Sequence, residues 1–455
     1  MRFAMIVRTI PFALAGLLLL ASASPAAAGV ESLLQPASGS VLFVSKANGS
    51  NSNPGTREAP LANIDRAISR AAAGDTILVA EGVYNGTFDI GFLESDKPLR
   101  LYGGFAPDFS SRDPQAHPTR IQPDNASAAK SRKALLTFTR QIDGVVVDGF
   151  VFDMGQRNAY HAVEGKPAGV ESGRLLLPPE RSGGDNPTVT EPCLAIPSAA
   201  AGGDLLIQNN VFVNCAKFAI QAGLRSGNLR ILDNVFVANR MAAIEAYGTC
   251  AGASGSGPGA AVSCGRVEIA GNVILFSWSR TKELKDMGYG VRVMTKLEYD
   301  IHDNLIGGNV LAGVDHSRFN PDRWLRLDRN TFFVNRKADV EYSPASNTTL
   351  DLRVEQLGDL EIASATGNRG EIPKGLAVDR AYLGGFLGAH YRETTDLDRN
   401  SPANQWRSAL GLNLQGTMTS AVSMYGNRYP WQKALELLAA TGGRNSGISR
   451  PGSSP

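Results

Sequence analysis

Hydrophobic and polar positions repeat in rows along residues 205–341. A row has apolar residues two apart, a polar pair ending in Asn, and a second apolar run, as in Leu205-Leu-Ile-Gln-Asn-Asn210-Val-Phe. The same pattern returns at four later asparagines, which are Asn234, Asn272, Asn304 and Asn330. The steps between successive asparagines are 24, 38, 32 and 26 residues. Internal repetition at such a period is typical of architectures in which each row is one structural unit stacked on the next.

A second landmark divides four of the five rows further. Another asparagine follows the first by four or five residues, and an apolar pair such as Ala219-Ile220 comes soon after it. Each row therefore offers three short strands separated by two Asn-bearing turns. Parallel strands need a crossover connection, and the other strands of the same row can supply it. The pattern predicts a coil whose rungs stack at about 4.8 Å.

The asparagines themselves have a structural interpretation. Asn tolerates left-handed turn geometry. Its amide can also bond to identical copies above and below, as in stacked Asn ladders. We therefore expect the repeated asparagines to hold the turns, and we do not count them as functional residues.

The N-terminal part of the chain carries a family resemblance. After a strand at residues 41–44, residues 61–72 have apolar side chains at helical spacing, followed by Gly74-Asp75-Thr76-Ile77 and Glu81-Gly82-Val83-Tyr84. This order resembles the N-terminal cap and first rungs of secreted right-handed parallel β-helix proteins of pectate-lyase-like fold. The resemblance implies a fold and no particular reaction.

Together these patterns predict an all-β protein. We expect a right-handed parallel β-helix over residues 29–390, with an N-terminal capping helix, a C-terminal capping segment and a loop excursion at residues 153–201. The excursion is rich in Gly, Pro and charge and breaks the rhythm of the rows. Gly149 is expected to stand in the Asn position of its row. Residues 391–455 would hold a cap and a disordered tail, with a helix at residues 430–440 closing the open C-terminal core.

The first 28 residues predict a signal peptide. Arg2 and Arg8 precede a short apolar core at residues 12–21, and small residues follow at 26–28. No later segment has about 18 consecutive apolar residues, so we expect no transmembrane span in the mature chain. Removing the two arginines leaves 43 basic against 43 acidic residues. No basic stripe with interleaved aromatic residues suggests nucleic acid as a partner. We expect an exported monomer that is periplasmic, on the cell surface or secreted.

Four cysteines remain in the mature chain: Cys193, Cys215, Cys250 and Cys264. An even count in an exported protein favours disulfides, and four cysteines allow three connectivities. We favour Cys250–Cys264, which would close the insertion at residues 251–263, and Cys193–Cys215. A metal cluster is a poorer interpretation, because no Cys-x-x-Cys pair or nearby His gives ligand spacing.

Candidate chemistry lies in the third strand of each row, where one residue per row is expected to point outward. This column comprises Gln221, Glu245, Arg292, Asp315 and Glu341. Tyr247, His316 and Arg318 are expected beside it, although His316 also suits an exposed bystander. The simplest interpretation is a solvated sheet face with alternating charges. The functional one is a polysaccharide groove in which Glu245, Arg292 and Asp315 carry any catalysis, and Gln221, Tyr247, His316, Arg318 and Glu341 bind substrate.

Two reactions can be weighed at this column. Inverting hydrolysis needs carboxyl groups about 6.5–9.5 Å apart, and Glu245 and Asp315 would lie two rungs, or about 9.6 Å, apart. The Asp-Asp and Gly-His-Gly signatures of β-helix polygalacturonases are absent. The family resemblance suggests β-elimination as the other reaction, in which Ca²⁺ or Arg neutralises a uronate and Lys or Arg removes a proton. Lys282, Lys285 and Arg292 stand in a plausible row, without a lyase motif around them.

These observations lead to one functional hypothesis with two alternatives. We expect a β-helix protein that interacts with polysaccharide or another cell-envelope glycan and is not clearly catalytic. The alternatives are a lyase or epimerase acting on an acidic glycan, and a structural envelope or adhesion protein. The sequence shows no cofactor motif, and it leaves Ca²⁺ open as a ligand.

Overall fold

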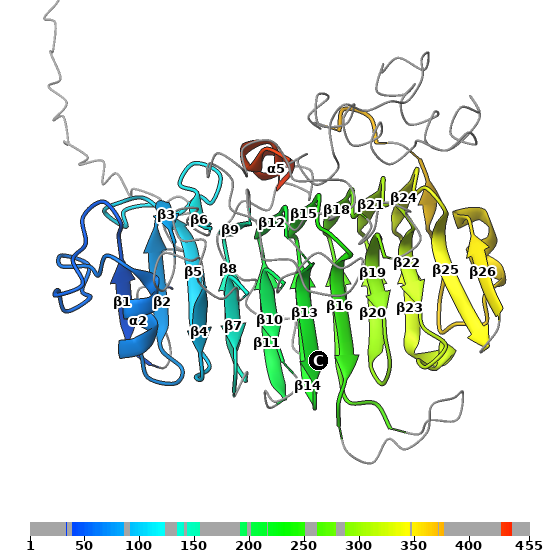
Figure 1. Cartoon of the computed structure of the whole chain (residues 1–455), viewed down its shortest axis with the longest axis horizontal. Coiled ribbons are helices and arrows are strands. Elements are labelled where there is room, and N and C mark those ends of the chain that lie inside the picture. Colours follow the sequence, from blue (N-terminus) through cyan, green and yellow to red (C-terminus); the bar gives the residue numbers. More distant parts are fainter. Residues whose placement is uncertain are drawn as a thin grey trace, which may run out of the picture.

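The chain winds into a long coil with three parallel sheets along its sides (Figure 1). The computed structural model describes residues 33, 39–85, 92–122, 134–140, 143–154, 192–197, 202–215, 217–250, 262–278, 287–345, 348–371, 373–376 and 429–438. The predicted signal peptide at residues 1–28 lies outside these residues. So do the closing segment at 377–390, most of the excursion at 153–201, and Lys282 and Lys285.

Between residues 76 and 345, each turn of the coil contributes one strand to each of the three sheets. Sheet A contains β1 (Val41–Val44), β2 (Thr76–Ala80), β5 (Arg100–Phe105), β8 (Val145–Asp148), β11 (Gly203–Gln208), β14 (Gly227–Leu232), β17 (Arg266–Ala270), β20 (Glu298–His302) and β23 (Leu325–Asp328). Sheet B contains β3 (Gly82–Tyr84), β6 (Thr119–Ile121), β9 (Phe150–Asp153), β12 (Val211–Val213), β15 (Val235–Val237), β18 (Val273–Leu275), β21 (Leu305–Gly307), β24 (Thr331–Phe333) and β27 (Arg369–Gly370). Sheet C contains β4 (Leu93–Ser95), β7 (Leu136–Phe138), β10 (Leu194–Ile196), β13 (Phe218–Leu224), β16 (Ala242–Gly248), β19 (Tyr289–Val293), β22 (Ala312–His316), β25 (Ala338–Ala345) and β26 (Thr348–Leu352). The predicted parallel β-helix is confirmed.

Alternation along each strand fills the coil with apolar columns. Ile207, Ile231 and Ile269 pair in register across sheet A and are fully buried. In sheet B, the rings of Phe152 and Phe212 stack 4.8 Å apart. The next step, from Phe212 to Phe236, is 5.1 Å. These spacings are close to the separation of neighbouring strands, because identical side chains recur one rung apart.

Stacked asparagines hold the turn from sheet A to sheet B, as predicted. The ladder consists of Asn210, Asn234, Asn272, Asn304, Asn330 and Asn368, each donating its side-chain amide to the oxygen of the next. The residue before the ladder asparagine takes the left-handed conformation, as Asn209 (φ 54°) and Asp303 (φ 55°) do. Gly149 (φ 83°) stands at this left-handed position rather than at the ladder position, because Asp148 pairs with Gln208 and Val151 with Val211.

The two ends of the coil are covered differently. Helix α2 (Ile64–Arg70) buries Ile64, Ala67 and Ile68 against the N-terminal core, as predicted. At the other end, β26 pairs antiparallel with β25, and the 3₁₀ helix η5 (Val354–Asp359) buries Leu357 in the core. An edge strand and a short helix therefore close the C-terminal end of the described coil.

The C-terminal helix α5 (Trp431–Glu436) does not close that end, so this prediction is wrong. It lies over the outer face of sheet B, against β9, β12 and β15 (Figure 1). The valines of these strands, such as Val211 and Val235, alternate with inward phenylalanines and present an apolar outer face, which Tyr429 and Leu438 cover. A sheet with two apolar faces must be covered on both. Helix α5 therefore packs on the outer face of sheet B, in the middle of the coil.

Replacing Tyr429 with alanine should release α5 locally. The Tyr429 side chain is 1% exposed, and its main-chain N–H and C=O both bond to the side chain of Asn214, at 2.8 and 2.9 Å. Loss of the ring should raise hydrogen exchange in α5 by at least about tenfold, which is about 1.4 kcal/mol of local stability. Lys433→Ala, which removes only an exposed ion pair with Glu436, is the matched control. Equal exchange in both variants would contradict this docking.

Candidate functional site

The outward column predicted for the third strand of each row lies in register on sheet C. Gln221 pairs with Glu245, Glu245 with Arg292, Arg292 with Asp315, and Asp315 with Glu341. One polar side chain therefore comes from each of β13, β16, β19, β22 and β25, which run side by side along the coil (Figure 1). The regular alternation of the rows places all five on one face.

Arg292 lies at the centre of this column. Its Nε donates to Asp315 Oδ2 at 2.9 Å, and its Nη1 contacts Glu245 Oε2 on the other side. Glu245 Oε1 in turn accepts a hydrogen bond of 2.7 Å from the side-chain amide of Gln221. The side chains of Arg292, Glu245 and Asp315 are only 16%, 8% and 13% exposed. The column is thus a nearly buried ladder of charges.

A second group of contacts continues the ladder. Lys337 Nζ lies 2.7 Å from Glu341 and 3.0 Å from Asp351 on β26. The hydroxyl of Tyr289 donates to Glu341 Oε1 at 3.1 Å, and its ring lies 5.7 Å from the Arg292 guanidinium. Arg292 and Lys337 are therefore each held between two carboxylates.

Burial and neighbouring charges perturb the acids of the column. Burial raises the pKa of Asp315, Arg292 acts in the opposite direction, and Glu341 and Glu245 add to the rise. The pKa of Tyr289 is also raised, first by burial and then by Asp315 and Glu341. Burial raises the pKa of Tyr247 as well, with Glu245 adding to the effect. Asp315 thus keeps its proton to a higher pH than an ordinary aspartate.

The residues expected beside the column divide into two groups. Tyr247 follows Glu245 by two positions on β16, so it shares the outer face and is half-buried. Arg318 lies on the turn after β22, where its guanidinium is 4.5 Å from the centre of the exposed Phe319 ring. Tyr247 therefore extends the column, whereas Arg318 stands beyond the end of the sheet.

The expectation that His316 lies on the outer face is wrong. Its side chain is 0% exposed, pairs in register with Val293 and Tyr342, and stacks on the Tyr342 ring at 5.0 Å. Neighbouring residues of a strand face opposite sides of the sheet, so an outward Asp315 requires an inward His316. Burial lowers the pKa of His316 to about 4, with a partial offset from Asp322.

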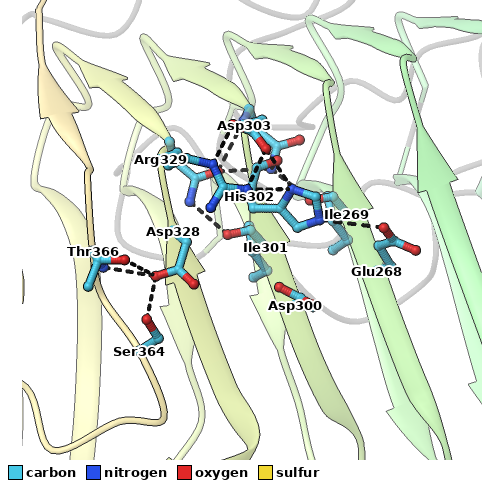
Figure 2. A network of polar contacts seen from close by, with 12 residues as sticks. Glu268, Ile269, Asp300, Ile301, His302, Asp303, Asp328, Arg329, Ser364 and Thr366 are labelled. Carbon is cyan, nitrogen blue, oxygen red and sulfur yellow. Dashed lines mark hydrogen bonds and ion pairs between the residues drawn. The ribbon is translucent and has the colours of Figure 1, made fainter. Parts of the chain in front are cut away.

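The structure also shows a polar network on sheet A that the sequence interpretation missed (Figure 2). His302 on β20 lies 2.8 Å from Asp303 and 3.4 Å from Glu268 on the preceding rung. Arg329 donates to both carboxylate oxygens of Asp303, at 2.9 and 2.7 Å. The hydrogen bond with Glu268 raises the pKa of His302, burial lowers it, and Asp303 raises it further. Three neighbouring rungs are linked in this way.

The network borders an open pocket of about 450 Å³. Its floor is formed by outward side chains of β17, β20 and β23, including Arg266, Asp300 and Arg326. Trp324, at the end of the 3₁₀ helix η4 (Asp322–Trp324), also lines it. Inward and outward residues alternate in the first strand of each row as they do in the third. This alternation in the sequence would have identified the polar residues on the outer face of sheet A.

Cysteine pairing and metal ligands can be read directly from the described residues. Cys193 is bonded to Cys215 and Cys250 to Cys264, which is the connectivity favoured from the sequence. Within the described part of the chain, His, Cys, Asp and Glu form no group of three suited to a metal ion. No helix in that part is long and apolar enough to cross a membrane.

Sequence comparisons with known proteins match short segments of the chain. A family model described as "Protein of unknown function (DUF1565)" matches residues 47–92. The uncharacterized protein YwoF of Bacillus subtilis (strain 168) is 43% identical over 63 residues, which is 14% of this chain and 13% of YwoF. The chain therefore spans only a small part of this curated relative.

The chain is also similar to several solved structures, at low sequence identity. A complex of XylC with xylose matches with a TM-score of 0.40 and 15% identity, over 66% of this chain and 63% of XylC. A rhamnogalacturonan lyase matches at 0.36 and 12%, over 69% and 79% of the two chains. Pectate lyase Pel9A matches at 0.32 and 13%, over 71% and 76%. With its three sheets of stacked strands and its repeated rungs, the chain is a parallel β-helix repeat protein.

Proposed function

We propose that this protein is exported and binds a polysaccharide on the outer face of sheet C. The observation that carries the proposal is the continuous ladder from Gln221 through Glu245, Arg292 and Asp315 to Glu341. It repeats polar groups at the strand spacing of about 4.8 Å, which is comparable with the length of one sugar residue in an extended chain. Tyr247 adds a half-buried aromatic side chain beside it. Both disulfides support export, because such bonds persist in oxidising compartments.

The charges of this face favour a neutral glycan over an acidic one. Arg292 and Lys337 are each bound by two carboxylates, so four acids surround two cations. An acidic polymer would have to displace these contacts and approach the remaining negative charge. The lyase alternative requires a cation that is available to a uronate, and Arg292 is committed to Glu245 and Asp315.

Removing the side chains of Gln221, in the column, and Tyr247, beside it, tests the proposal. We expect the double variant Gln221→Ala/Tyr247→Ala to bind a neutral polysaccharide at least about tenfold more weakly, which is about 1.4 kcal/mol. Neither side chain fills the core of the coil, so the fold should be kept. Affinity electrophoresis against neutral and acidic polysaccharides gives the measurement, with the exposed Asn228→Ala on sheet A as the control.

The outcomes separate the three hypotheses. Retention by neutral glycans that the double variant loses supports the proposal. Unsaturated product from alginate or pectate, detected by absorbance with and without Ca²⁺, would replace it with the lyase hypothesis. Absence of retention on every glycan would favour a structural envelope or adhesion role.

A further inference from the structure

The pocket on sheet A is built by a difference in loop length. Four residues connect β19 to β20, whereas eight, residues 317–324, connect β22 to β23. The longer connection ends in η4 and places Trp324 beside the outward side chains of β20 and β23. Ala363, from the segment that closes the coil, lines the pocket as well. The pocket is therefore formed by the longer loop and the closing segment at the last rungs of the coil.

Trp324 gives this pocket an aromatic wall. The indole is half-buried, and the Arg323 guanidinium lies 5.4 Å from its ring centre. A tryptophan held in this way offers a flat apolar surface together with a polar edge. Such a surface suits the C–H face of a sugar ring better than a fully charged ligand.

Four arginines and three carboxylates line the pocket, and Asp303, which lies outside the lining, is a fourth carboxylate paired with Arg329. Arg266 is paired with Asp300, and Arg329 with Asp303. Arg323 and Arg326 share the pocket with Glu298 and Asp328. No excess charge is left to select an ion, yet donors and acceptors alternate over a short distance. A hydroxyl group both donates and accepts hydrogen bonds, so a ring bearing several hydroxyls can use both kinds of partner.

We propose that this pocket is a second glycan-binding site, which takes an uncharged sugar unit stacked on Trp324 and hydrogen-bonded by Glu298, Asp300 and Arg326. It lies on the outer face of sheet A, and no residue of the sheet C column lines it. The inference goes beyond the proposed function, because it concerns a different face and a different set of residues. One molecule would then bind sugar on two faces of the coil.

Tryptophan fluorescence and calorimetry with short oligosaccharides test the pocket. The probes are cellohexaose, xylohexaose and mannohexaose as neutral ligands and hexagalacturonate as the acidic one, each at low and high NaCl. We expect at least one neutral hexasaccharide to bind with little dependence on salt. Trp324→Ala should weaken this binding at least about tenfold, and Trp324→Phe, which keeps an aromatic ring, should retain part of it.

Two control variants make the result specific. Phe319→Ala removes a 41% exposed aromatic side chain from the same loop, outside the pocket lining, and should leave the binding intact. Gln221→Ala/Tyr247→Ala changes only the sheet C face, so it should weaken sugar binding there and leave unaltered the part of the fluorescence change that Trp324→Ala removes. If the double variant abolishes all binding while Trp324→Ala changes nothing, the sheet C site stands and the second site is refuted. Salt-sensitive binding of hexagalacturonate alone, or binding of none of the four probes, would also overturn the inference.

Discussion

Replacing Asn272 with alanine should lower the free energy of unfolding by about 3 kcal/mol or more. The Asn272 side chain is 1% exposed and makes bonds on both neighbouring rungs. Its Oδ1 accepts from the backbone and side-chain N–H groups of Asn234, at 2.9 and 3.1 Å. Its amide donates to Ile231 O and to Asn304 Oδ1, both at 2.9 Å. Alanine leaves several of these buried groups without partners, and each costs about 1–3 kcal/mol.

Urea denaturation followed by circular dichroism measures this loss. The control is Asn228→Ala, because Asn228 is an exposed sheet A residue whose side chain donates to Asp204. A surface change of this kind is expected to stay within about 0.5 kcal/mol. If both variants unfolded at the same urea concentration, the ladder would contribute little to stability, and the turns would depend on packing alone.

The coil was predictable because its signals are periodic and local. Alternating apolar residues specify the inner columns, and the recurring asparagines specify the turns. The position of α5 was not predictable in the same way. Its apolar face could cover an open end or a sheet, and the choice depends on the outward valines of β12 and β15, which lie far away in sequence. Long-range competition between two apolar surfaces decides such a placement.

The sequence predicted which residues of the candidate site lie in register on sheet C. It did not predict which side chains form ion pairs with one another. Counting two residues per strand period placed Glu245, Arg292 and Asp315 in one column. The same counting, applied strictly, excludes His316 from the outer face and brings His302 and Asp300 to the outer face of sheet A. The sequence does not give the distances between the charged side chains. That Arg292 binds two acids at once follows only from the stacking of three rungs.

Replacing Arg292 with alanine should destabilise the protein by about 3–5 kcal/mol at neutral pH. That range is typical when one partner of a buried ion pair is removed, because the other charge is left uncompensated. Here two carboxylates are left, those of Glu245 and Asp315, on either side of the missing cation. Arg266→Ala is the matched control on sheet A, because Arg266 is 55% exposed and breaking its pair with Asp300 should cost at most about 1 kcal/mol.

The pH dependence of this loss identifies its cause. The folded-state pKa of Asp315 is already raised, and removing Arg292 takes away the largest influence that lowers it. A carboxyl group with a raised folded pKa binds its proton more tightly in the folded than in the unfolded state, so its contribution to stability falls as pH rises through that pKa. The deficit of Arg292→Ala should therefore be largest at neutral pH and shrink as pH falls towards about 4, the ordinary carboxyl pKa. Adding Glu245→Gln and Asp315→Asn to the variant should recover part of the stability at neutral pH. A deficit that is independent of pH and is not relieved by these changes would mean that Arg292 acts through packing rather than charge.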